Sequence, residues 1–143
     1  MENIFKWGMA VIAAVVSFLW GEWSTLLNVL IALAFIDYAS GMAASWIEGK
    51  KYPNDTKKGW SSKIGMIGIA KKFFIFLVIG VANLIDQTLI ETGMREEPIL
   101  FTAAIVFYIA NELLSITENV GRIGVPLPPQ IKQVIQVLKG EGK

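Results

Sequence analysis

Cysteine and histidine are both missing from this sequence of 143 residues. Without cysteine the chain forms no disulfide and carries no thiolate. Without either residue it lacks the commonest transition-metal ligands and the usual general base. Charged residues are also scarce, at 17% of the chain against about 25% in a typical soluble protein. We therefore expect no catalytic residue, no cofactor site and no metal site.

Apolar residues take the place of the missing charges and make up 54% of the chain. A folded domain of this size leaves a large share of its surface exposed, so it cannot hide that much apolar surface from water. A lipid bilayer removes the conflict. The sequence therefore predicts an all-α integral membrane protein whose single membrane domain covers residues 1–143.

Four apolar runs are candidates for transmembrane helices, which need about 17–25 residues. The third run is the weakest, because its uncharged stretch is residues 73–85 alone. The glycine-rich residues 64–70 are either its leading turns or a separate interfacial or re-entrant piece. An arrangement of three spans with one outer run in the interface therefore stays open. The predicted helices cover about residues 4–21, 23–47, 66–90 and 98–119.

A lysine-rich segment, residues 48–72, lies between the second and third runs and carries a net charge of +5. Residues 86–97 carry a net charge of −3. Because loops rich in Lys and Arg stay in the cytoplasm, four crossings place the lysine-rich segment and both termini inside and residues 91–97 outside. Lysines beside a membrane meet anionic lipid more simply than nucleic acid, so we expect no nucleic-acid partner. The predicted contacts with lipid headgroups are Lys50, Lys51, Lys57, Lys58, Lys71 and Lys72.

A short amphipathic helix is predicted at residues 130–139, beyond a proline-rich stretch that cannot continue a helix. Its apolar residues recur at i, i+3, i+4 and i+7, which places them on one face. They are Ile131, Val134, Ile135 and Leu138.

Asp37 interrupts the second apolar run near its middle. A charge at that depth costs about 2.5–3.5 kcal/mol. Gly41 and Ser45 follow four and eight positions on, so the same helix face carries small residues that allow close packing. Two interpretations stay open. The face is a pore-lining or packing stripe that drives homo-oligomerisation, or Asp37 pairs with a lysine or polar group of its own subunit.

A second polar face lies at the end of the fourth run, where Glu112, Ser115 and Asn119 are spaced i, i+3 and i+7. This face is a further candidate for pore lining or helix packing. The alternative is a solvated helix end, since helix ends near the interface tolerate charge.

Two patterns that would suggest an enzyme are incomplete. The carboxylates of Asp37, Glu112 and Glu118 have no nucleophile or base beside them in the sequence. Gly65 and Gly68 precede Lys71, but a phosphate-binding loop ends in Gly-Lys followed by Ser or Thr. We therefore expect that the protein is not an enzyme.

Three motifs stand out along the chain: Asp37-Tyr38-Ala39-Ser40-Gly41 with Trp46 and Gly49-Lys50; Ser61-Ser62-Lys63 with Gly65, Gly68 and Lys71-Lys72; and Asn111-Glu112-Leu113-Leu114-Ser115-Ile116-Thr117-Glu118-Asn119 with Gly124-Val125-Pro126-Leu127-Pro128. Together they resemble the phage holin family that includes the toxin-secretion holins of clostridia. The third motif is the most specific, and the resemblance covers roughly residues 25–138.

The resemblance implies a multi-pass protein of the bacterial cytoplasmic membrane. Such proteins associate into lesions that release an endolysin to the peptidoglycan or export a large protein, and the family implies no catalytic residues. On this view Asp37 lines or gates the lesion, because hydration would lower the cost of its charge. Two other functions stay open: a small ion or solute channel or transporter, and a non-conducting membrane adaptor. Against a transporter, residues 1–47 and 64–116 show no convincing internal repeat.

Overall fold

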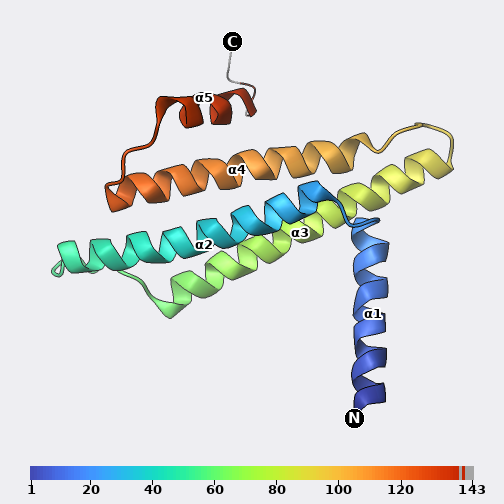
Figure 1. Cartoon of the computed structure of the whole chain (residues 1–143), viewed down its shortest axis with the longest axis horizontal. Helices are drawn as coiled ribbons and strands as arrows, with labels where there is room; N and C mark the ends of the chain where they lie inside the picture. The colour runs from blue at the N-terminus through green and yellow to red at the C-terminus, as the bar shows by residue number, and fades with distance from the viewer. Residues whose placement is uncertain (139, 141–143) are drawn as a thin grey trace.

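The computed structural model describes residues 1–138 and 140, without the side chain of Leu138. Every regular element in this part of the chain is a helix (Figure 1). The first four helices are long and apolar enough to cross a membrane, which confirms the predicted all-α membrane fold. The helices are α1 (Glu2–Trp20), α2 (Thr25–Lys51), α3 (Ser62–Glu91), α4 (Ile99–Ile123) and α5 (Pro129–Leu138).

Helices α2, α3 and α4 lie side by side, and α4 packs along α2 for most of its length (Figure 1). The half of this bundle nearest the α3–α4 loop has an apolar core. Leu27 and Leu30 of α2 are buried there against Ile79 of α3 and against Ile105 and Ile109 of α4. Between membrane helices such contacts stabilise through close packing, because lipid is as apolar as the side chains themselves.

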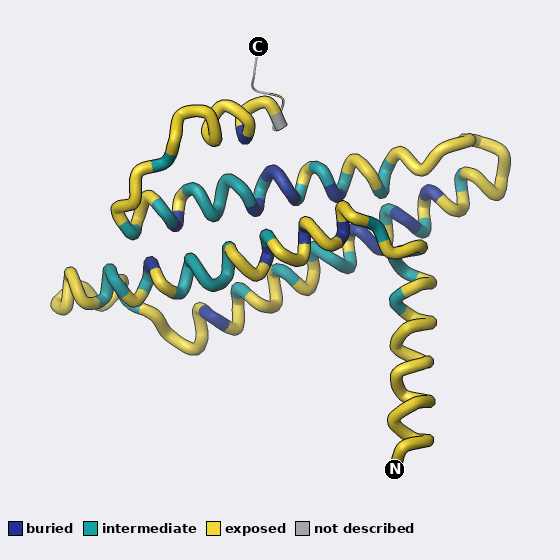
Figure 2. The backbone as a smooth tube through the Cα atoms, viewed as in Figure 1, coloured by how far each residue is buried: buried dark blue, intermediate teal, exposed yellow. Residues whose placement is uncertain are grey.

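The outer surface of the bundle carries large apolar side chains that no other helix covers. Most positions along the tube are exposed (Figure 2), and Phe35, Phe74 and Phe107 are 72%, 62% and 59% exposed. A soluble monomer rarely exposes so much apolar surface. The surface therefore suits contact with lipid.

Two serine residues fix the starts of α2 and α3. Ser24 Oγ and Ser61 Oγ each accept a hydrogen bond from the backbone N–H three residues on, both at 3.3 Å, as helix N-caps do. Helix α3 therefore begins at Ser62, before the predicted residue 66. Residues 64–70 are its leading turns and not a separate interfacial piece.

Helix α1 extends away from the bundle at a steep angle to the other long helices (Figure 1). None of its residues, all of which are described, is buried. Its last turn is held to α3, where Trp20 Nε1 donates to the carbonyl of Phe76 at 2.8 Å and Asn83 Nδ2 donates to the carbonyl of Leu19 at 3.0 Å. The chain then turns at Gly21, whose φ of 70° favours glycine.

Helix α5 runs back beside α4 after the proline-rich linker (Figure 1). Ile135 is buried, at 4% exposed, whereas Val134 on the predicted apolar face is 58% exposed. The short C-terminal helix is thus confirmed. The predicted end of that helix, residue 139 and the side chain of Leu138, lies outside the described residues.

Candidate functional site

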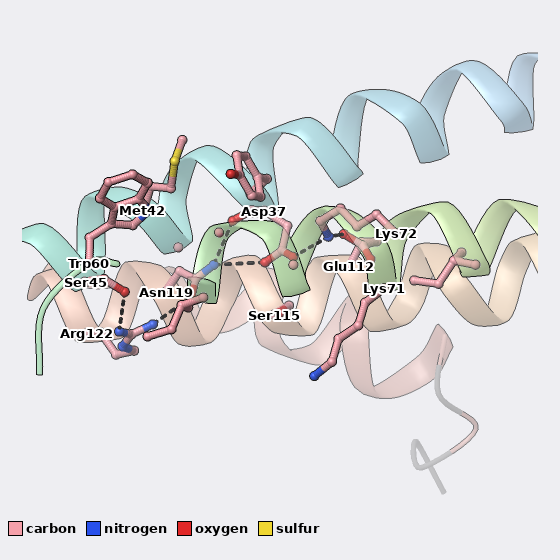
Figure 3. Close-up of a pocket in the computed structure, with 16 residues that line it drawn as sticks. Asp37, Met42, Ser45, Trp60, Lys71, Lys72, Glu112, Ser115, Asn119 and Arg122 are labelled. Carbon is pink, nitrogen blue, oxygen red and sulfur yellow. Dashed lines mark hydrogen bonds and ion pairs between the residues drawn. The ribbon is translucent and has the colours of Figure 1, made fainter. Parts of the chain in front are cut away.

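Three charged side chains from three helices meet inside the bundle (Figure 3). Lys72 of α3 places its Nζ 2.6 Å from Asp37 Oδ2 of α2 and 2.6 Å from Glu112 Oε2 of α4. The side chains of Lys72, Asp37 and Glu112 are only 18%, 13% and 6% exposed. We call these three residues the ion-pair cluster.

The ion-pair cluster is paired but not balanced. Burying a charge away from water is costly unless it is paired and hydrogen-bonded. Every buried side-chain nitrogen or oxygen among the described residues has a hydrogen-bond partner. However, two carboxylates share one ammonium, so the cluster carries one net negative charge when all three groups are ionised.

Asn119 of α4 continues the polar contacts from Asp37 along the α2–α4 interface. Its Nδ2 donates to Asp37 Oδ1 at 2.9 Å, to the Asp37 carbonyl at 3.1 Å and to Ser40 Oγ at 3.0 Å. A Cβ added at Gly41 would lie 3.4 Å from this nitrogen, so the amide packs directly beside the glycine. These bonds join α2 to α4 without Lys72.

Arg122 closes the same interface near the end of α4. It donates from Nε and Nη2 to the two carboxylate oxygens of Glu48, at 3.1 and 2.8 Å. It also donates to Ser45 Oγ and Asn119 Oδ1, both at 3.3 Å. A forked arginine–carboxylate pair of this kind gives geometric specificity. Because the Arg122 side chain is 39% exposed, the pair contributes little to stability.

A pocket of about 340 Å³ lies beside the ion-pair cluster, between α2, α3 and α4. Liquid water occupies about 30 Å³ per molecule, so the pocket has room for several waters. Among the described residues no group of His, Cys, Asp and Glu side chains could hold a metal ion. The six residues predicted to line a pore or pack helices all line this pocket: Asp37, Gly41, Ser45, Glu112, Ser115 and Asn119.

The structure shows the contacts that the residues of the two polar faces make within one subunit. Asp37 pairs with a lysine of its own subunit, Lys72. Glu112 and Asn119 are 4% and 8% exposed, so they are buried and do not form a solvated helix end. Whether these residues also line a pore stays a prediction.

One predicted headgroup contact is wrong. Lys72 was expected at the lipid surface, but its ammonium lies between two carboxylates in the bundle. The next residue back, Lys71, is exposed, and its side chain extends away from the cluster (Figure 3). The remaining predicted contacts are likewise exposed, and headgroup binding stays a prediction for them: Lys50, Lys51, Lys57 and Lys58.

Three of these lysines lie over aromatic rings near the α2–α3 loop, with Lys51 Nζ 5.5 Å from the centre of the Tyr52 ring. Lys50 Nζ is 4.0 Å from the centre of the Trp46 ring, and Lys58 Nζ is 3.8 Å from that of Tyr52. Trp46 and Tyr52 are themselves exposed. Exposed Trp and Tyr beside lysine are typical of the membrane–water interface.

Asp86 is a buried acid, although it begins the acidic stretch of residues 86–97. It lies within α3 and is 1% exposed. Its two oxygens accept hydrogen bonds from the backbone N–H groups of Leu100 and Phe101, at 3.1 and 2.7 Å. It therefore caps the start of α4 from a neighbouring helix, where the helix dipole favours a negative charge. No local pattern reveals such a cap, because donor and acceptor belong to different helices.

Residues 14–140 match the model of the bacteriophage holin family. The chain belongs to this family. The matched range includes Asp37, Lys72 and Glu112, so the ion-pair cluster lies within the family's domain. The match confirms the resemblance noted in the sequence, and with four apolar helices it establishes a multi-pass membrane protein.

Several relatives are similar to this chain over most of its length, and one of them is named as a probable holin. An uncharacterized protein of Halalkalibacterium halodurans is 48% identical over 141 residues, which cover 99% of this chain and 98% of the relative. An uncharacterized 14.9 kDa protein of Clostridium perfringens is 35% identical, over 99% of each chain. A protein named "Probable holin" from Bacillus phage phi105 is 34% identical, over 87% of this chain and 82% of its own. No solved structure matches this holin-family protein.

Proposed function

We propose that this holin-family protein accumulates in the bacterial cytoplasmic membrane and self-associates into lesions. An endolysin would pass through them to the peptidoglycan, or a large protein would be exported through them. The observation that carries the proposal is the pocket with its ion-pair cluster, a polar interior inside a bundle whose outer surface is apolar.

The contrast between interior and exterior suits a protein that is harmless while dilute. As a single subunit, the protein offers apolar side chains to lipid and satisfies its polar groups internally. In a membrane, polar groups are tolerated where they face protein or a water-filled cavity. When subunits associate and helices rearrange, the same polar groups can line a hydrated hole.

The residues that would line this hole come from two helix faces. Asp37, Gly41 and Ser45 contribute from α2, and α4 contributes the matching polar positions. Asp37 would be favoured by hydration, because a carboxylate is costly in lipid, and the same holds for the carboxylate of Glu112, which contacts the same lysine. The α4 positions are Glu112, Ser115 and Asn119.

The proposed topology places the α2–α3 loop and both termini in the cytoplasm. The support is the lysine excess of residues 48–72 and the exposed aromatic rings of Trp46 and Tyr52 beside lysines. Anionic lipid attracts each such lysine by about 1 kcal/mol near the surface. Membrane lipids and further copies of the chain are therefore the proposed physical partners, and the endolysin is a functional one.

The test is to induce the protein in bacteria together with a muralytic enzyme that has no export signal. We expect an abrupt fall in culture density at a reproducible time. Cells with the enzyme alone, and cells with this protein alone, provide the controls and should show no such abrupt fall. Slow growth loss with flux of one solute would instead indicate a channel or transporter, and the absence of any effect would indicate an adaptor.

A further inference from the structure

We propose that the Lys72 ion pair closes the pocket and sets the time of lysis, by holding the first third of α3, residues 62–72, against α2 and α4. The inference rests on the proposed function and adds to it the contact that regulates lesion opening. Lys72 would act by positioning the start of α3. It would thereby keep the carboxylates of Asp37 and Glu112 covered.

The two parts of α3 are held very differently. Its later part is buried in the bundle at Ile79, Gly80, Asn83 and Asp86. In residues 62–72 only Gly65 is buried, although every residue of this stretch is described. The pocket occupies the space between this stretch and the other two helices.

Few contacts attach residues 62–72 to the bundle. Among the described residues, the two bonds from Lys72 are the only hydrogen bonds that join this stretch to another helix. Two glycines of this stretch also pack against Tyr38 of α2: a Cβ at Gly65 would lie 3.1 Å from its hydroxyl, and a Cβ at Gly68 would lie 3.5 Å from its ring. If Lys72 is released, no other hydrogen bond to a helix among the described residues holds this stretch in place.

The rest of the bundle does not depend on Lys72. Asn119 and Arg122 join α2 to α4 through their own hydrogen bonds. Asp86 joins the later part of α3 to α4, and Asn83 joins it to α1. Release of Lys72 would therefore move one end of α3 and leave the other helices associated.

The charges of the ion-pair cluster predict that two substitutions have opposite effects on how firmly the pocket is closed. Glu112→Gln would leave Lys72 and Asp37 as a one-to-one pair and remove the excess negative charge. The pocket would then be held closed more firmly. Lys72→Met would leave two carboxylates without their cation, and both favour a hydrated site over a dry one. The pocket would then open more readily.

The first experiment measures the onset of lysis with the co-expressed muralytic enzyme, at equal protein level in the membrane fraction. We expect Glu112→Gln to delay onset and Lys72→Met to advance it. Lys63→Met is the matched control, because it removes the same charge from an exposed position in the same stretch of α3 and should keep the wild-type schedule. Onset that shifts in the same direction for Glu112→Gln and Lys72→Met, or in neither variant, would overturn the proposal.

The second experiment does not rely on the folding of Lys72→Met. Because the chain has no cysteine, Tyr38→Cys with Gly68→Cys can be joined by a short, reducible bis-thiosulfonate reagent. We expect the joined protein to block lysis and a reducing agent to restore it, while each single cysteine variant lyses despite the reagent. If the joined protein lyses on schedule, the closing role of α3 is refuted and the holin function stands. If unmodified wild type fails to lyse cells, it is the proposed function that fails.

Discussion

Asn119 and Asp37 are 82 positions apart in the sequence, and one amide nitrogen of Asn119 donates to both the carboxylate and the carbonyl of Asp37. This contact joins α4 to α2 at the level of the ion-pair cluster. It also fixes the orientation of the Asp37 carboxylate, whose other oxygen accepts from Lys72. The cluster is thus held by a neutral amide on one side and by a cation on the other.

We predict that Asn119→Leu lowers the free energy of unfolding by about 1–2 kcal/mol, because it leaves buried acceptors of Asp37 and Ser40 without this donor. The measurement is denaturant unfolding of the purified protein in detergent micelles. Asn111→Leu is the matched control, since the Asn111 side chain makes no hydrogen bond among the described residues. Equal stability of the two variants would contradict the role given to Asn119.

We predict that Asp86→Ala loosens the start of α4. The N–H groups of Leu100 and Phe101 would lose their acceptor, and loss of a helix cap typically costs about 0.5–2 kcal/mol. Hydrogen exchange at these two amides should become faster than in wild type. Glu91→Gln, at the exposed end of α3, should leave exchange unchanged. Unchanged exchange in Asp86→Ala would show that another group supplies the cap.

The proposed topology can be tested because the chain has no cysteine of its own. Thr56→Cys lies in the exposed α2–α3 loop, and Met94→Cys lies in the exposed α3–α4 loop. A membrane-impermeant maleimide added to intact cells should label Met94→Cys, and it should label Thr56→Cys only after the membrane is opened. Labelling of both positions from the same side would exclude a membrane-spanning α3.

The sequence was sufficient to predict the spans and the two polar faces, because both depend on local helical periodicity. Asp37, Gly41 and Ser45 share a face wherever α2 is helical, and the same holds for Glu112 and Asn119 on α4. That the two faces meet at one pocket depends on tertiary packing. The local patterns of the two helices do not contain this information.

The identity of the cation could not be predicted. Lys71 and Lys72 are adjacent and chemically alike, and one residue along a helix turns a side chain by about 100°. Only the packing of α3 decides that Lys72 faces the carboxylates, which lie 35 and 40 positions away in the sequence. The position of α1 is likewise tertiary, since its last turn is joined to α3 by hydrogen bonds that involve Trp20 and Asn83.

The central claim is that the pocket surface becomes hydrated when the lesion forms. The most direct measurement is the reaction of Ser115→Cys with a charged, membrane-impermeant thiol reagent, before and after the onset of lysis. Ser115 lines the pocket, whereas the matched control Phe107→Cys replaces an exposed apolar residue on the outside of α4. Both variants must lyse on the wild-type schedule. The account predicts that Ser115→Cys is protected before onset and reacts quickly afterwards, while Phe107→Cys stays protected by lipid, since thiols react as hydrated thiolates. A Ser115→Cys that stays protected through lysis, or a Phe107→Cys that reacts in its place, would contradict it.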